Sequence, residues 1–178
     1  MLGRGKMDIK IEPAALALLD KLYEIETASF REEAFTRSQI ASLLTDCNDL
    51  VFVAQIGGET AGFVIATLEI VGKKTFGHIL TIDVLPHYRR IGIARRLLHT
   101  VEAAFRENGI PECRLEVRED NSAALSLYLK LGYQKVGRLE KILREKTRRA
   151  PEKDPLGGRD SFVRPVPNKF KHRSIKPR

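Results

Sequence analysis

The chain has 178 residues, of which 43% are hydrophobic and 30% are charged, so its length suits one globular domain with an appended segment. No apolar run approaches the roughly 18 residues that a membrane-spanning helix needs, and residues 1–10 lack the apolar core of a signal peptide. We therefore expect a cytoplasmic protein without membrane contact.

The location of the net charge and the spacing of the cysteines indicate which partners and which kinds of site to expect. Residues 142–178 hold 12 Lys/Arg and 4 Asp/Glu, whereas residues 1–141 hold 19 of each, so the whole net charge of +8 lies in the C-terminal segment. Any contact with nucleic acid is therefore expected from that segment. Cys47 and Cys113 are widely spaced and the four histidines are scattered. This pattern favours reduced thiols over a disulfide and indicates no metal site.

The first half of the chain predicts a strand, two helices and a hairpin. Residues 8–11 alternate as in a short strand, and Pro13 opens a helical pattern of apolar residues. Thr36 and Gln39 have the spacing of a capping box, which predicts the start of a second helix. The β-rich runs 50–56 and 60–68 flank a Gly-Gly turn and predict a hairpin.

The second half predicts alternating strands and helices. Residues 79–84 form an apolar strand, and residues 91–107 an amphipathic helix. A further strand at 113–117 should run parallel to the first, because a helix separates the two. Asn121 suits the N-cap of a helix through Lys130, and residues 133–136 begin another strand. The pattern is α+β, with a mixed central sheet and helices on both sides.

The turn between strand 79–84 and the following helix has the character of a phosphate site. It reads Arg89-Arg90-Ile91-Gly92-Ile93-Ala94. The first amides of a helix have no partner inside it, and the helix dipole favours an anion there. Two arginines at this helix end oppose the dipole unless an anion lies between them. The turn lacks the three glycines of a dinucleotide site and the Gly-Lys-Ser/Thr of a P-loop, so another phosphate-bearing ligand is indicated.

Three sequence blocks carry a resemblance to a known family. The first is Gly77-His78-Ile79-Leu80-Thr81-Ile82-Asp83-Val84, and the second is the turn at 89–94. The third runs from Leu115-Glu116-Val117-Arg118 through Asn121, Ala124 and Leu127-Tyr128 to Gly132-Tyr133. In order and spacing they resemble the GNAT superfamily of acyl-CoA N-acyltransferases. Within it they resemble the ribosomal-protein-alanine acetyltransferases and the archaeal protein N-terminal acetyltransferases. The resemblance covers about residues 8–141.

The resemblance implies a GNAT-like, mostly antiparallel mixed sheet with helices on both faces, and acetyl-CoA as co-substrate. It implies that the turn amides hold the pyrophosphate and that the end of strand 79–84 pairs with the pantetheine arm. The implied acetyl-CoA site comprises Ile82, Asp83, Val84, Arg89, Arg90, Ile91, Gly92, Ile93, Ala94, Arg95 and Asn121. Glu116 matches the general base and Tyr128 the general acid of the ribosomal branch.

Each of these side chains also has a purely structural interpretation. Glu116 can be a solvent-facing charge in a strand, Tyr128 a core aromatic, and Asn121 only a helix cap. His78 is interpreted as structural. Asp83 stands where the family often has a small residue, so we expect a backbone role at that position. An ordinary packed loop at 30–35 is as consistent with the sequence as an acceptor loop.

The implied activity is acetyl transfer to the N-terminal α-amine of a protein, such as a ribosomal protein, by direct attack of the amine. An acetyltransferase for lysine side chains, polyamines or small amines is the first alternative. A catalytically weak adaptor that binds acyl-CoA or RNA is the alternative of another class.

The C-terminal segment departs from the family pattern. The family continues with a pair of tyrosines and a closing strand, whereas this chain reads Ile142-Leu143-Arg144-Glu145 and then becomes basic and proline-rich. We expect residues 142–178 to be disordered and to lie outside the domain of residues 1–141. The codons ATA-TTA-CGG-GAA would encode these four residues, and reading one base later gives Tyr-Tyr-Gly. A frameshifted tail is therefore one hypothesis, and a basic extension that contacts ribosomal RNA is the other.

Overall fold

The computed structural model describes residues 8–138 and 159–166. Seven strands in these ranges form one sheet in the order β1-β2-β3-β4-β5-β7-β6. The strands are β1 Ile9–Pro13, β2 Asp49–Ile56, β3 Glu59–Val71, β4 Lys74–Val84, β5 Glu112–Arg118, β6 Gln134–Arg138 and β7 Arg159–Pro165. The helices are α1 Leu19–Phe30, α2 Arg37–Thr45, α3 Ile93–Glu107 and α4 Ser122–Lys130, with short 3-10 turns at Leu16–Leu18, Arg31–Glu33 and Pro86–Tyr88.

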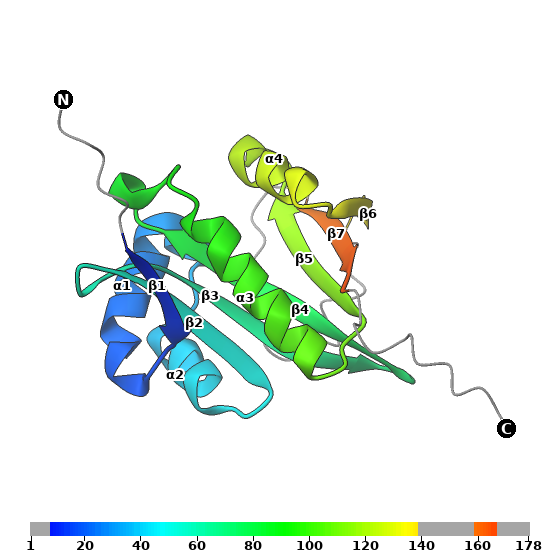
Figure 1. Cartoon of the computed structure of the whole chain (residues 1–178), viewed down its shortest axis with the longest axis horizontal. Helices are drawn as coiled ribbons and strands as arrows, with labels where there is room; N and C mark the ends of the chain where they lie inside the picture. The colour runs from blue at the N-terminus through cyan, green and yellow to red at the C-terminus, as the bar shows by residue number, and fades with distance from the viewer. Residues whose placement is uncertain (1–7, 139–158, 167–178) are drawn as a thin grey trace, which may run out of the picture.

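Helices cover both faces of the sheet (Figure 1). α1 and α2 share one apolar cluster with β2 and β3, whereas α3 packs into a second cluster that also contains Tyr128 of α4. β4 and β5 are parallel, as predicted, and every other neighbouring pair in the described sheet is antiparallel. The predicted α+β class, a mostly antiparallel mixed sheet with helices on both faces, is therefore confirmed.

Local sequence signals account for several of these elements. The Thr36 side chain caps α2, and Gln39 completes the predicted capping box. Gly57 and Gly58 have φ angles of 59° and 84°, which the tight turn between β2 and β3 requires. The amphipathic helix predicted over 91–107 begins two residues later, with Gly92 as the N-cap of α3.

The second hairpin is longer than the sequence predicted. We expected strands over 60–68 and 79–84, but β3 extends to Val71 and β4 begins at Lys74. The added residues surround Gly72, whose φ is 62°. The exposed side chains of Ile70 and Val71 lie near this turn, so no apolar alternation marks the extension in the sequence.

β4 contains an irregularity that shapes the centre of the sheet. Its pairing with β3 joins Thr81 to Ile65 and Ile79 to Ala66, so Leu80 is an extra residue, as in a β-bulge. The parallel pairing with β5 covers only Gly77–Ile79. Residues 80–84 therefore continue β4 without β5 as a neighbour, and the two strands separate at the bulge.

A glycine brings α3 close to this junction. A Cβ atom placed on Gly77 would lie 2.3 Å from the Phe105 ring, so only glycine lets the ring pack against the strand. The Phe105 side chain is fully buried. The glycine before His78 is therefore required by the packing of α3 on β4.

The prediction that residues 142–178 lie outside the domain is wrong for residues 159–165. They form β7, which inserts between β5 and β6 and pairs antiparallel with both. Asp160 and Phe162 alternate inward along the strand. The sheet thus has a closing strand, and a tail read out of frame from Ile142 onward would not be expected to supply one. Val166, just after β7, is also buried in the core. Residues 142–158 and 167–178, with their predicted disorder and RNA contact, lie outside the described residues.

Long-range contacts fix β7 in the fold. Arg164 Nη1 donates to both carboxylate oxygens of Glu102 on α3, at 2.7 and 2.8 Å. The hydroxyl of Tyr133 donates to the same carboxylate at 2.9 Å. Arg159 donates to Glu33, which follows α1, at 2.6 Å. These arginines neutralise acidic groups of the domain, so their charge is not free for a nucleic acid.

None of the helices in residues 8–138 and 159–166 combines the length and the apolar composition that crossing a membrane requires.

The packing of β7 predicts a large effect of Phe162→Ala. Because this side chain is only 1% exposed, its removal should lower the free energy of unfolding by about 3–5 kcal/mol. Ser161→Ala, on the partly exposed neighbour in the same strand, should change it by less than about 0.5 kcal/mol. Urea unfolding of both variants measures the difference, and equal effects would show that β7 contributes no packing.

Candidate functional site

The turn before α3 has the backbone of an anion site. Arg90 has a φ of 67° and Gly92 a φ of 91°, so two residues of the turn adopt left-handed conformations. Alternation of this kind turns successive amides toward one concave side. The first bond of α3 runs from the Arg96 amide to the Gly92 carbonyl at 3.1 Å. The amides of residues 93–95 therefore have no acceptor inside the helix.

The space around this turn is accessible. A Cβ atom on Gly92 would meet nothing within 4 Å, and the side chains of Arg90 and Arg95 are exposed. Arg89 is held differently, because its Nε donates to the Val84 carbonyl at 2.9 Å. This bond ties the turn to the end of β4, so the two parts of the predicted acetyl-CoA site are adjacent.

At the end of β4, the side chains are mostly turned into the protein. Asp83 and Val84 are buried, and Ile82 is partly buried against the cluster that contains α3. A ligand at this strand end would therefore meet backbone groups first, as predicted for Asp83. Among the described residues, the bulge and the separation from β5 leave the edge of residues 80–84 without a neighbouring strand on that side.

The carboxylate of Glu116, the predicted base, is not a freely solvated charge, because it contacts a histidine. Its Oε2 lies 2.5 Å from Nε2 of His78, and Nδ1 of His78 lies 2.7 Å from Oε1 of Glu69. Strands β3, β4 and β5 each contribute one of the three residues. The side chains of all three are at most 20% exposed. The histidine therefore bridges two carboxylates beside the point where β4 and β5 separate.

This arrangement fixes the charge of His78. Burial alone would lower its pKa, but the hydrogen bonds to Glu116 and Glu69 outweigh burial and raise the pKa to about 10. The imidazole is consequently a cation at neutral pH and donates from both ring nitrogens. It cannot accept a proton in that state, so only the carboxylates of Glu116 and Glu69 are proton acceptors in the cluster, and the role of Glu116 as the base stays a prediction.

Tyr128 combines packing with a protected hydroxyl. Its side chain is 5% exposed, and its ring contacts those of Tyr133 and Phe162, with centroids 5.7 and 6.4 Å away. Burial, and then the negative charge of Asp83, raise the pKa of the hydroxyl. The group therefore stays protonated and is able to donate a hydrogen bond at physiological pH. The core interpretation is correct, and a role toward a ligand stays a prediction.

Comparison with known protein families matches residues 19–133 to the acetyltransferase (GNAT) family. The chain belongs to this family. An N-alpha-acetyltransferase of the archaeon Sulfurisphaera tokodaii is 32% identical over 152 residues, which cover 79% of this chain and 86% of the relative. The protein is thus an acyl-CoA N-acyltransferase that transfers acetyl groups.

Solved GNAT structures share the fold. The ribosomal-protein-S18-alanine N-acetyltransferase of Escherichia coli superposes with a TM-score of 0.72 at 22% identity, covering 93% of this chain and 98% of that chain. Arabidopsis thaliana NAA60, in a complex with acetyl-CoA, gives a TM-score of 0.71 at 20% identity, covering 89% and 99% of the two chains. At these identities the similarity shows the fold alone.

Within this GNAT fold, Asn121 has the structural role that its position suggested. Its side chain accepts the Ala124 amide at 3.1 Å and caps α4. The residue is exposed, so a second contact with acetyl-CoA stays a prediction. The sequence did not predict the two other members of the Glu116 cluster. His78 was interpreted as structural, and Glu69 was not considered, because the strand register that joins them is not visible in the sequence.

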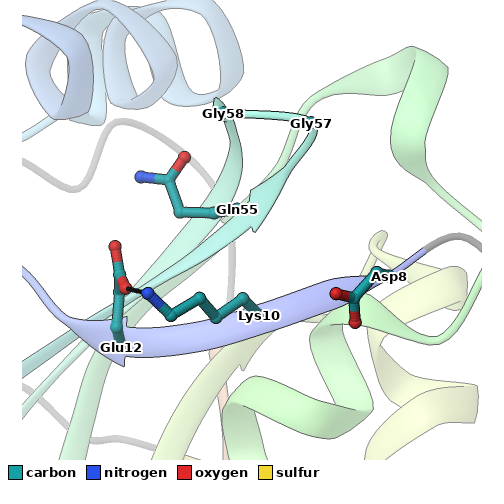
Figure 2. A pocket seen from close by; sticks show the side chains of 6 residues that line it. All are labelled: Asp8, Lys10, Glu12, Gln55, Gly57 and Gly58. Carbon is teal, nitrogen blue, oxygen red and sulfur yellow. Dashed lines mark ion pairs between the residues drawn. The ribbon is translucent and has the colours of Figure 1, made fainter.

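An open cleft lies elsewhere on the enzyme. It has a volume of about 520 Å³ and lies beside β1 and the turn after β2, where Lys10 forms an ion pair with Glu12 (Figure 2). Asp8, Gln55, Gly57 and Gly58 complete its lining, and none of the predicted site residues is among them. Within residues 8–138 and 159–166, no group of three or more His, Cys, Asp or Glu side chains is placed to hold a metal ion.

The cluster around His78 predicts a pH-dependent effect of His78→Gln on stability. Because the folded pKa is raised, the imidazolium contributes its full stability below pH 6.5 and loses it as the pH rises through about 10. The variant leaves two partly buried carboxylates without their cation and should lose about 3 kcal/mol near pH 6.5, the lower end for breaking a buried pair.

Urea unfolding between pH 6 and pH 10 tests this expectation, and the loss should shrink toward pH 10. His87→Gln is the matched control, because that imidazole is 60% exposed and lies 4.0 Å from its carboxylate partner, Glu59. A loss for His78→Gln that is independent of pH would contradict the assigned charge.

Proposed function

We propose that this GNAT enzyme transfers the acetyl group of acetyl-CoA to the N-terminal α-amine of proteins. The observation that carries the proposal is the relationship to the archaeal N-alpha-acetyltransferase, which extends over 79% of the chain. The E. coli neighbour acts, by its name, on an alanine of a ribosomal protein. Ribosomal proteins are therefore one class of acceptor to test.

The chemistry of the site suits an α-amine. The amine must lose its proton before it attacks, and an α-amine has a pKa of about 8 against about 10.4 for lysine. Glu116 is the group assigned to take that proton, directly or through a water. His78 holds the Glu116 carboxylate in place with a charge-assisted hydrogen bond. This contact orients the base.

The other end of the reaction involves the anion turn and Tyr128. Attack of the amine nitrogen on the thioester carbon breaks the carbon–sulfur bond and leaves a thiolate, whose proton comes finally from solvent. We assign to Tyr128 a hydrogen bond toward that sulfur. Its raised pKa makes full transfer of its proton to a thiolate of pKa about 8.5 unfavourable. The turn at 89–95 holds the pyrophosphate with its amides, and Arg90 and Arg95 add charge.

A panel of acceptors tests the proposal. Peptides beginning with Ala, Ser or Met should be acetylated with acetyl-CoA, and blocking the N-terminus should abolish the reaction. Mass spectrometry of the products locates the acetyl group. Modification of lysine side chains or polyamines alone would replace the proposal with the first alternative, and thermal stabilisation by acetyl-CoA without turnover would favour the adaptor.

Two substitutions test the assigned roles. Glu116→Gln should lower kcat by about 10²-fold, the lower end for loss of a general base, and should raise the acetyl-CoA KM much less. Tyr128→Phe should lower kcat by about tenfold, the value of one hydrogen bond of about 1.4 kcal/mol to the leaving group.

The matched control is Glu112→Gln, which removes a half-buried carboxylate from the same strand, four residues away. Melting temperatures should accompany each rate, because Glu116 also pairs with His78. Unchanged rates in the first two variants would overturn both assignments.

A further inference from the structure

Two buried carboxyl groups from distant parts of the chain meet on the α1 side of the sheet. Glu26 of α1 is 1% exposed and Asp83 of β4 is 5% exposed. Their side chains lie within hydrogen-bonding reach of each other. Neither belongs to the cluster around His78, and the reaction outlined above uses neither side chain.

Glu26 joins two segments that border the site. Its Oε1 accepts the amide of Phe35 at 3.1 Å, in the connection between α1 and α2. Its Oε2 accepts the hydroxyl of Thr81 at 3.1 Å, one residue after the bulge in β4. One carboxyl group therefore fixes the end of the α1–α2 connection against the part of β4 that separates from β5.

One oxygen of the buried Asp83 carboxyl group has no donor in the part of the chain that the structure describes. Its Oδ2 is buried and has no hydrogen-bond partner among the described residues. The Ser29 hydroxyl bonds the carboxyl group, and Arg89 is the nearby cation that favours its charge. Arg89 already donates its Nε to the Val84 carbonyl. Two adjacent buried carboxylates repel each other, and one proton between them removes the repulsion and supplies the missing donor.

We propose that Glu26 and Asp83 share one proton and act as a positioning pair, which holds the α1–α2 connection and the bulged end of β4 in the geometry needed for acetyl transfer. The inference rests on the proposed function, because it assigns the α1–α2 connection to the acceptor side and the end of β4 to the thioester side. The pair touches neither substrate and acts through Phe35 and Thr81.

The shared proton makes the geometry sensitive to alkaline pH. Burial, and then the charge of Glu26, raise the pKa of Asp83 to about 8, whereas Ser29 and Arg89 favour its charged form. Burial likewise raises the pKa of Glu26. The buried hydroxyl of Tyr128 stays neutral in this range. Loss of the proton leaves two negative charges between α1 and β4. Their repulsion pushes the α1–α2 connection away from the bulged end of β4.

Asp83→Asn tests the inference, because the amide keeps the shape and supplies an N–H donor to Glu26 at every pH. With an Ala-starting peptide, the wild-type kcat should fall about tenfold between pH 8 and pH 9.5, beyond the pH at which the amine itself is deprotonated. Normalised to its own kcat at pH 7.5, the variant should lose the alkaline decline. Glu24→Gln, an exposed carboxyl on the same helix, should retain the wild-type profile.

A measurement without turnover tests the shared proton itself. The folded pKa of Asp83 exceeds its unfolded value of 3.8, so its stabilising effect is full below pH 3.8 and is lost as the pH rises through about 8. Relative to Asp83→Asn, the unfolding equilibrium constant of the wild type should therefore rise by up to tenfold per pH unit between pH 5 and pH 8.

The two experiments separate the inference from the proposed function. If no peptide is acetylated, the unfolding measurement still decides whether the proton is shared. If peptides are acetylated but the wild type and Asp83→Asn show the same alkaline profile, the positioning role is overturned and the proposed function stands. Parallel unfolding curves of the two proteins across pH 5–8 would overturn the shared proton.

Discussion

The short parallel junction between β4 and β5 is the constraint on which the rest of the structure depends. Only the residues from Gly77 to Ile79 pair with β5, and the bulge at Leu80 follows at once. A longer ladder would leave the end of β4 no free edge, and a shorter one would not hold the two halves of the sheet together. Gly77 lets Phe105 pack on this junction, so α3 and the N-terminal turn that we propose binds an anion are placed relative to the same point.

The sequence predicted those features that depend on neighbours along the chain. The capping box at Thr36, the hairpin at Gly57 and the amphipathic face of α3 are local patterns, and the structure contains all three. The order of the three sequence blocks likewise identified the family. The bulge at Leu80 has no local signature, because strand 79–84 is equally apolar with or without an extra residue.

The closing strand was missed for a similar reason. Arg159, Phe162 and Arg164 lie in a segment rich in Lys, Arg and Pro, whose composition is typical of disorder. In the fold, the two arginines neutralise Glu33 and Glu102, which are more than 60 residues away in sequence. Composition describes a charge excess but does not identify its partners, and here two of those positive charges are matched by long-range ion pairs within the domain.

The sequence motif proposes which residues form the site, but it does not predict their electrostatic environment. Glu116 and Tyr128 were chosen from a motif, whereas the contacts of His78 and Glu26 depend on strand register and helix packing. These contacts resolve the same physical problem in two ways, because each brings carboxyl groups together away from water. At His78, an imidazolium lies between two carboxylates. At Asp83, Nε of the nearby Arg89 donates to the Val84 carbonyl instead, and the proposed shared proton supplies the donor that the carboxyl group lacks.

The two clusters therefore differ in how they respond to pH. The His78 cation remains until about pH 10, so its contact with Glu116, the proposed base, persists through ordinary changes of pH. A shared proton exchanges with solvent and is lost near pH 8. In this proposal, His78 controls the orientation of Glu116, and Asp83 controls the spacing between the α1–α2 connection and the end of β4. Both residues belong to strand β4. A residue as small as the one that the family often has at position 83 would remove the second control and leave the first intact.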